Sequence, residues 1–160
     1  MDIRHLTLGQ DREVVASLFS NATDYVLLET GRPPDSGTVD EFFDERPPNV
    51  GPSGAVHFGA FEAEQVVGIL GMTFGYPEET DAYIGLLLLS EDARGRGLGS
   101  EILAAATNVA RRHGAKRQFI AVLDENPKGR AFWEREGFEF EQTFPPTDDA
   151  HKRHRMVREV

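Results

Sequence analysis

The stretch from residue 82 to residue 113 constrains the fold more than any other part of this chain. It opens with Ala82–Leu89, a nearly continuous apolar run that is short and flanked by turn residues, which predicts a buried strand. From Glu101 to His113 the apolar residues recur at helical spacing, and Gly114 follows as a C-terminal cap would. A glycine-rich turn therefore joins a buried strand directly to the start of a long helix.

The chemistry of that turn favours an anionic ligand. Glycine allows backbone N–H groups to approach a bulky anion closely, and the dipole of the following helix favours negative charge at its N-terminus. Arginine adds positive charge and fork-shaped donors. We therefore predict a phosphate or pyrophosphate site formed by Arg94, Gly95, Arg96, Gly97, Leu98, Gly99 and Ser100.

Two common phosphate motifs match this turn poorly. A Walker A loop ends in Gly-Lys-Ser/Thr, and no lysine lies between Gly95 and Ser100. The dinucleotide fingerprint requires a further glycine where Ser100 or Ile102 stands. Binding of a nucleotide is therefore the least favoured hypothesis, and a glycine-rich turn with surface arginines and no ligand is the plainest alternative.

Length and composition predict one globular domain over residues 1–160. The absence of cysteine excludes disulfides, thiolate zinc sites and a cysteine nucleophile, and it fits a reducing cytoplasm. No signal peptide and no apolar run of membrane-spanning length is found. His151 and His154 have no obvious third ligand nearby in sequence, so we expect no metal.

Charge is distributed unevenly along the chain, whose formal net charge is -10. Residues 1–90 hold 15 acidic and 4 basic side chains, whereas residues 91–135, around the proposed phosphate turn, hold 6 and 9. An acidic first half argues against nucleic acid and suits a cationic small molecule or a basic peptide. A simple solvated surface is the alternative reading of the same charges.

Turn signals and periodicity predict the remaining elements in order. We expect a strand near residues 3–7, helices over 11–20, 25–30 and 38–43, strands over 55–61 and 66–74, the central strand and helix, and a strand over 116–123. A short helix over 129–136, a strand over 138–141 and a final edge strand over 155–160 follow, and an exposed edge is compatible with a homodimer. The pattern indicates an α/β fold with a mostly antiparallel sheet and one crossover.

Two motifs together resemble the GNAT superfamily of N-acetyltransferases. The spacing of Arg94, Gly97 and Gly99 resembles the family's motif A, whose loop holds the pyrophosphate of acetyl-CoA. Downstream, Asn126, the pair Phe132 and Trp133, and the pair Gly137 and Phe138 resemble motif B. The resemblance covers about residues 55–144.

This resemblance implies a GNAT-like single domain, with a mixed central sheet, helices on both faces, and parallel strands that splay apart at the cofactor site. Pantetheine would lie in that gap, paired with the backbone of Leu87, Leu88 and Leu89. Asn126 would hold a pantetheine amide or the acceptor, because its side chain carries both donors and an acceptor. Phe132 and Trp133 would pack near the thiol end, and ordinary core packing is an equally good reading of both.

The implied reaction is direct attack of a primary amine of a small molecule or peptide on the thioester of acetyl-CoA, which requires a base and often an acid. Many family members carry tyrosine where Trp133 stands, and an indole is no practical acid. Many also carry a glutamate base near Tyr83 and Gly85. Asp81 and Tyr83 are our candidates for catalysis, with Glu78, Glu79, Tyr76 and Tyr25 behind them. These departures leave open a non-catalytic CoA-binding module.

Overall fold

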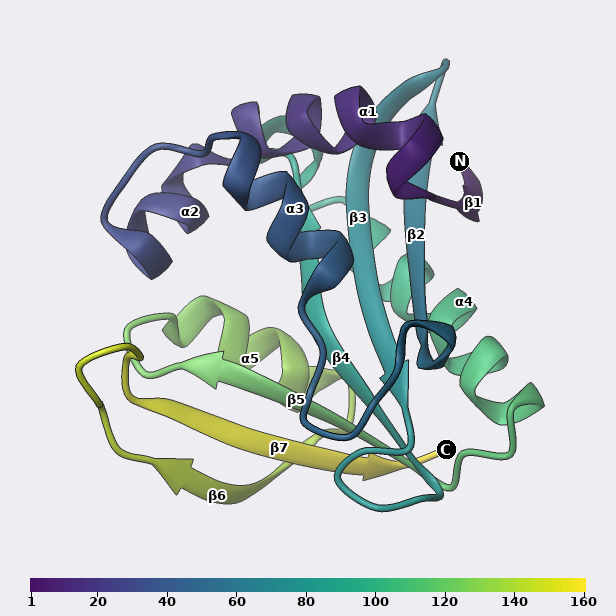
Figure 1. The fold of residues 1–160 in the computed structure, drawn as a ribbon, viewed down its shortest axis with the longest axis vertical. Coiled ribbons are helices and arrows are strands. Elements are labelled where there is room, and N and C mark those ends of the chain that lie inside the picture. The colour runs from purple at the N-terminus through teal and green to yellow at the C-terminus, as the bar shows by residue number, and fades with distance from the viewer.

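A computed structural model describes residues 1–160 as one α/β domain built on a seven-stranded sheet (Figure 1). The strands are β1 (Asp2–His5), β2 (Ala55–Glu62), β3 (Gln65–Phe74), β4 (Asp81–Leu89), β5 (Arg117–Leu123), β6 (Glu139–Phe144) and β7 (Arg153–Glu159). The helices are α1 (Leu8–Ser20), α2 (Thr23–Thr30), α3 (Ser36–Asp44), α4 (Leu98–Arg112) and α5 (Pro127–Arg135). Short 3₁₀ turns span Pro52–Gly54 (η1) and Glu91–Ala93 (η2).

The sheet has the strand order β1-β2-β3-β4-β5-β7-β6, and only the β4–β5 pair is parallel. This confirms the predicted mostly antiparallel α/β fold with one crossover, which α4 makes. The prediction of a C-terminal edge strand was wrong. β7 lies between β5 and β6, because it pairs with both of them, and β6 forms the edge instead.

Helices cover both faces of the sheet. Helices α1, α2 and α3 share one apolar cluster with residues of β3 and β4, including Ile69 and Leu88. Helices α4 and α5 contribute Ile102, Leu103 and Trp133 to a larger cluster on the opposite face. In Figure 1, α1 to α3 lie above the C-terminal strands, and α4 runs behind β2 to β4. The predicted arrangement of helices on both faces is confirmed.

Strands β4 and β5 stay together over only half of their length. Their ladder runs from Asp81, opposite Arg117, to Ile84, opposite Ile120, and then stops. The register between β3 and β4 also shifts at this point, since Gly71 faces Leu86 while Met72 faces Ile84, so Gly85 is the bulged residue. Beyond the bulge β4 follows β3 and β5 follows β7, and the two strands part as predicted.

A buried polar network holds β5 against α4 and β7. The Gln118 side chain of β5 accepts hydrogen bonds from the Thr107 hydroxyl at 3.1 Å and from Arg158 of β7 at 3.1 and 3.2 Å. Arg158 also donates to the Thr107 hydroxyl at 2.8 Å and to the Glu136 carbonyl at 2.6 Å. Buried polar groups are costly when unpaired, so this network fixes the side of β5 that faces α4.

All five helices begin two or three residues earlier than predicted, and the starts of α3 and α5 show the reason. Helix α3 begins at Ser36, and its N-cap is Asp35, whose carboxylate accepts from the Thr38 N–H at 3.1 Å. Thr38 itself is the N3 partner of that capping box and not the cap. Helix α5 begins two residues earlier than expected, because Pro127 occupies the first helical position after the Asn126 cap. No helix has the length and apolar character needed to cross a membrane.

Candidate functional site

The glycine-rich turn presents backbone N–H groups that have no acceptor in the protein. Gly95 and Gly97 have φ of 75° and 79°, in the left-handed region that favours glycine. Gly97 is the N-cap of α4, and no side chain caps this helix. The N–H groups of residues 95–100 have no acceptor within the protein. Several unpaired donors at the positive end of a helix dipole suit a phosphate or diphosphate.

The two arginines of the turn are both paired with carboxylates. Arg94 donates to both oxygens of Asp24 in α2, at 2.6 and 3.0 Å, and to the Leu89 carbonyl. Arg96 donates to both oxygens of Glu62 in β2, at 2.8 and 3.0 Å. The Arg94 guanidinium lowers the pKa of Asp24 through their hydrogen bond. The expectation of free guanidinium donors is therefore corrected, and the unpaired donors of this turn are backbone N–H groups.

Leu87, Leu88 and Leu89 occupy the part of β4 that has left β5. Their side chains pack into the two cores: Leu88 lies under the α1–α3 layer, and Leu87 and Leu89 pack towards α4. Their backbone pairs with β3 on one side only. An extended molecule between β4 and β5 would meet this unpaired strand edge, as the sequence led us to expect.

Asn126 is partly committed to the fold. Its side-chain oxygen accepts from the Gly129 N–H at 3.0 Å and so caps α5. The amide nitrogen has no partner in the protein and remains a donor. Asn126 directly follows the strand β5 and its turn, on the side of the gap opposite β4.

Phe132 and Trp133 both contribute to the core, and they do so to different degrees. Trp133 is buried between Phe132 and Phe138, with ring centroids 5.0 and 5.1 Å away in edge-to-face contact. Phe132 is half-buried, and its ring lies against the first turn of α4, where a Cβ added to Gly99 would meet it at 3.2 Å. A side chain at Gly99 would therefore require the Phe132 ring to shift by a few tenths of an ångström. Leu98 is likewise a core side chain.

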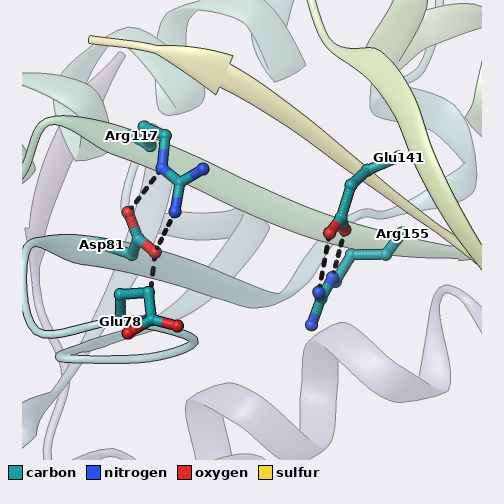
Figure 2. Close-up of polar contacts among 5 residues, drawn as sticks. All are labelled: Glu78, Asp81, Arg117, Glu141 and Arg155. Atoms are coloured by element: carbon teal, nitrogen blue, oxygen red, sulfur yellow. Dashed lines mark hydrogen bonds and ion pairs between the residues drawn. The ribbon is translucent and has the colours of Figure 1, made fainter.

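The contacts of Asp81 argue against its predicted catalytic role (Figure 2). Its side chain has no exposed surface and accepts from Arg117 at 2.9 Å on each oxygen, and from the Glu78 N–H at 3.1 Å. It lies at the closed end of the β4–β5 pair, six residues and about 20 Å of strand from Leu87. Its carboxylate fastens β4, β5 and the preceding loop together, and we do not retain it as a base.

Tyr83 is better placed than Asp81 for a catalytic role, because it lies next to the point where β4 and β5 part. It sits opposite Phe119, one residue before the strands part, and its side chain shares the α1–α3 face of the sheet with Leu88 beyond the bulge. Its ring contacts that of Tyr76 edge to face, with centroids 5.5 Å apart. Burial raises the pKa of Tyr83, followed by the effect of Tyr76, so the phenol keeps its proton near neutral pH.

The structure brings together carboxylates that the sequence did not single out. Glu29 lies in the last turn of α2, Glu41 lies in α3, and Glu45 follows α3. No basic side chain forms an ion pair with any of them. Although these residues are exposed, partial desolvation and then mutual repulsion raise the pKa of Glu45. Desolvation likewise raises the pKa of Glu29, where the Tyr25 hydroxyl opposes it. The acidic composition of the first half was their only sequence signal.

Two arginines of β7, Arg153 and Arg155, lie on the same face of the sheet as Tyr83. Arg155 lies over the Phe119 ring at 5.3 Å and is paired with Glu141 (Figure 2). Arg153 lies over the Phe144 ring at 4.9 Å and forms no ion pair. The loop between β6 and β7 crosses to α2, where His151 contacts the Glu29 carbonyl at 2.8 Å. Arg153, Arg155 and Glu45 lie close enough to Tyr83 to affect its pKa, so β7 and the end of α3 border the region around Tyr83.

These features fit a long ligand with a diphosphate at one end. Unpaired backbone donors lie at the turn before α4, an unpaired strand edge leads inward from it, and a half-buried aromatic ring lies beside its first helical turn. A Cβ added to Gly97 would meet nothing within 4 Å, so the space beside this turn is open. The residues present therefore suit the phosphate and pantetheine parts of coenzyme A.

This chain belongs to the Acetyltransferase (GNAT) family, whose family model matches residues 22–138. It is therefore an acetyltransferase of that family, and the resemblance read from the two motifs is confirmed. No curated protein matches the chain at the sequence level.

Solved structures give the same fold. An acetyltransferase from Thermus thermophilus is 29% identical, with a TM-score of 0.82 over 99% of this chain and 96% of that one. The ribosomal-protein-alanine N-acetyltransferase from Brucella melitensis is 19% identical over 100% of both chains, with a TM-score of 0.75. Ard1 from Thermoplasma volcanium is 19% identical, with a TM-score of 0.72 over 99% of this chain and 97% of that one. The last two show the fold alone.

The role of Asp81 can be tested by Asp81→Asn. Because a fully buried carboxylate loses two charge-assisted hydrogen bonds, we expect the free energy of unfolding to fall by about 1.5 to 3 kcal/mol. Urea unfolding measures this change. Glu141→Gln is the matched control, since the Glu141 side chain is 34% exposed whereas that of Asp81 is 0% exposed, and this substitution should cost less than Asp81→Asn. A stable Asp81→Asn protein with a strongly reduced kcat would instead restore Asp81 to catalysis.

Proposed function

We propose that this chain is an acetyl-CoA-dependent N-acetyltransferase that acetylates a primary amine of a small molecule or peptide. The observation that carries this proposal is the parting of β4 from β5 beside a turn whose backbone donors are unpaired. Acetyl-CoA would supply an activated acetyl thioester. The N–H groups of residues 95–100 would hold its diphosphate, the backbone of Leu87 to Leu89 and the Asn126 amide its pantetheine, and the Phe132 ring would lie beside it.

Tyr83 is our proposed proton donor. The neutral amine nitrogen would bond to the acetyl carbon and lose a proton to water, and the carbon–sulfur bond would break. The leaving thiolate would take a proton from the Tyr83 hydroxyl, which would regain one from water. Burial raises the pKa of Tyr83, so its hydroxyl is a donor at neutral pH and not a base. Trp133 is excluded from this role, because it is buried among aromatic rings and an indole N–H is not an acid.

A cationic acceptor is the form we favour. Glu29, Glu41 and Glu45 form no ion pair with a basic side chain, and Glu45 lies close enough to Tyr83 to raise its pKa. Desolvation raises the pKa of Glu29 and Glu45, so these two carboxylates accept a proton more readily than ordinary ones, and their negative charge attracts a cation. Polyamines, aminoglycoside-like amines and lysine side chains share the needed positive charge. A peptide amine remains within the same class of acceptor.

The deciding experiment is thiol release from acetyl-CoA across a panel of amines, with mass spectrometry of the products. We expect turnover with at least one polycationic amine and an acetyl group added to its nitrogen. Calorimetric binding of CoA without turnover on any acceptor would favour the alternative, a non-catalytic CoA-binding module. That alternative is suggested by Trp133 in place of tyrosine. Neither binding nor turnover would overturn the proposal.

The diphosphate assignment is tested by a matched pair of substitutions at Gly97. Asparagine and aspartate tolerate a left-handed φ better than other non-glycine residues, and they differ mainly in charge. Because an aspartate at this position would put a carboxylate before the backbone donors, we expect Gly97→Asp to bind CoA at least about 10-fold more weakly than Gly97→Asn. Calorimetry measures both. Equal affinities would argue that no phosphate meets this turn.

The role of Tyr83 is tested by Tyr83→Phe, which removes only the hydroxyl. If this hydroxyl assists the leaving thiolate, kcat should fall about 100-fold while CoA affinity stays unchanged. Tyr76→Phe is the control, because Tyr76 packs against Tyr83 edge to face and we give it no part in proton transfer. Equal kcat values for Tyr83→Phe and the unchanged protein would remove Tyr83 from the mechanism.

A further inference from the structure

Asp24 makes a contact that joins the phosphate-binding turn to the helix layer. It lies in the first turn of α2 and meets the Arg94 guanidinium through two hydrogen bonds, at 2.6 and 3.0 Å. Arg94 opens the turn, 70 residues further along the chain. A second link lies beside this one, since the Glu91 N–H donates to the Asn21 carbonyl at 2.8 Å.

The geometry leaves Arg94 little capacity for a phosphate. Its Nε and one terminal nitrogen also donate to the Leu89 carbonyl, at 3.3 and 3.1 Å. A guanidinium has five N–H donors, and four of them are used in these contacts. Through these hydrogen bonds Arg94 links the end of β4, the start of the turn and α2.

A contribution to the stability of the fold does not by itself explain the contact between Arg94 and Asp24. The side chains of Arg94 and Asp24 are 37% and 53% exposed, and exposed ion pairs add little to the free energy of unfolding. The contact is better explained by its effect on the positions of the backbone donors in the turn. Holding backbone donors in place before a ligand arrives reduces the ordering cost of binding.

Helix α2 extends from the cofactor side to the acceptor side. Its first turn carries Asp24, and its last turn carries Glu29, whose carbonyl is contacted by His151 from the β6–β7 loop. Tyr25 and Glu29 lie one helical turn apart and face each other. A rigid helix that touches both regions is suited to order them together.

We infer that Asp24 is a positioning residue, which holds the phosphate-binding turn in shape through Arg94 and couples that turn to the acceptor side of α2. This inference rests on the proposed function, because it concerns the binding of CoA and of the amine. It assigns Asp24 no contact with either substrate. Its effect reaches the cofactor only through Arg94.

The test is Asp24→Asn, with CoA affinity measured by calorimetry and with steady-state kinetics for both substrates. We expect CoA to bind about 5- to 10-fold more weakly, and KM to rise for acetyl-CoA and for the amine, while kcat changes less than about twofold. The melting temperature should remain close to that of the unchanged protein, because the lost pair is exposed.

Glu62→Gln is the matched control. It breaks the corresponding exposed pair with Arg96, on the other side of the turn, and does not involve α2. We expect it to change CoA affinity less than about twofold, since it leaves the coupling intact. In addition, Asp24→Asn should have no further effect in an Arg94→Gln background, because the two residues act as a unit.

The outcomes separate the two proposals. Unchanged or tighter CoA binding by Asp24→Asn, beside normal binding by the unchanged protein, would overturn the role of Asp24 alone. Equal losses in Asp24→Asn and Glu62→Gln would also overturn it, since the loss would then not depend on the contact with α2. Failure of the unchanged protein to bind CoA would overturn the proposed function together with this inference.

Discussion

The loss of hydrogen bonding between β4 and β5 beyond Ile84 is the feature on which the rest of this structure depends. Parallel strands normally pair along their length, and an unpaired strand edge in the middle of a sheet exposes backbone donors and acceptors. Here the pair is fastened at one end by the Asp81–Arg117 contact, and the bulge at Gly85 turns β4 away. The gap between β4 and β5 lies beside the turn that begins α4, so the unpaired strand edge and the unpaired N–H groups of the helix start lie next to each other.

The acidic character of the chain and its proposed affinity for an anionic cofactor are compatible for a structural reason. Both arginines of the turn are engaged by carboxylates, Arg94 by Asp24 and Arg96 by Glu62, so their charge is largely neutralised in place. The groups left to attract a diphosphate are then backbone N–H groups, which have fixed directions and carry no net charge. The surplus of carboxylates lies instead on α2 and α3, where a cationic acceptor would approach.

Comparison of residues within the motifs separates what a sequence pattern can predict from what it cannot. The backbone N–H donors of the turn can be predicted from local sequence, because the spacing of the glycines and the start of the helix fix where the N–H groups point. The ion pair of Asp81 was not foreseen, since alternation places this residue on the same face as Tyr83 but cannot reveal that Arg117 occupies both of its oxygens. Glu29 and Glu45 were missed, because they come from different elements and meet only in the folded chain.

The sequence by itself determined the order of the elements, the glycine-rich turn before α4, the two motifs and hence the family, since each depends on residues close together in the chain. Tertiary structure alone decided that β7 enters between β5 and β6, that Arg94 reaches Asp24, and which side chains face Tyr83. These depend on contacts between distant segments, whose partners are selected by packing and by pairing of buried polar groups. Local propensity and spacing carry no information about that selection.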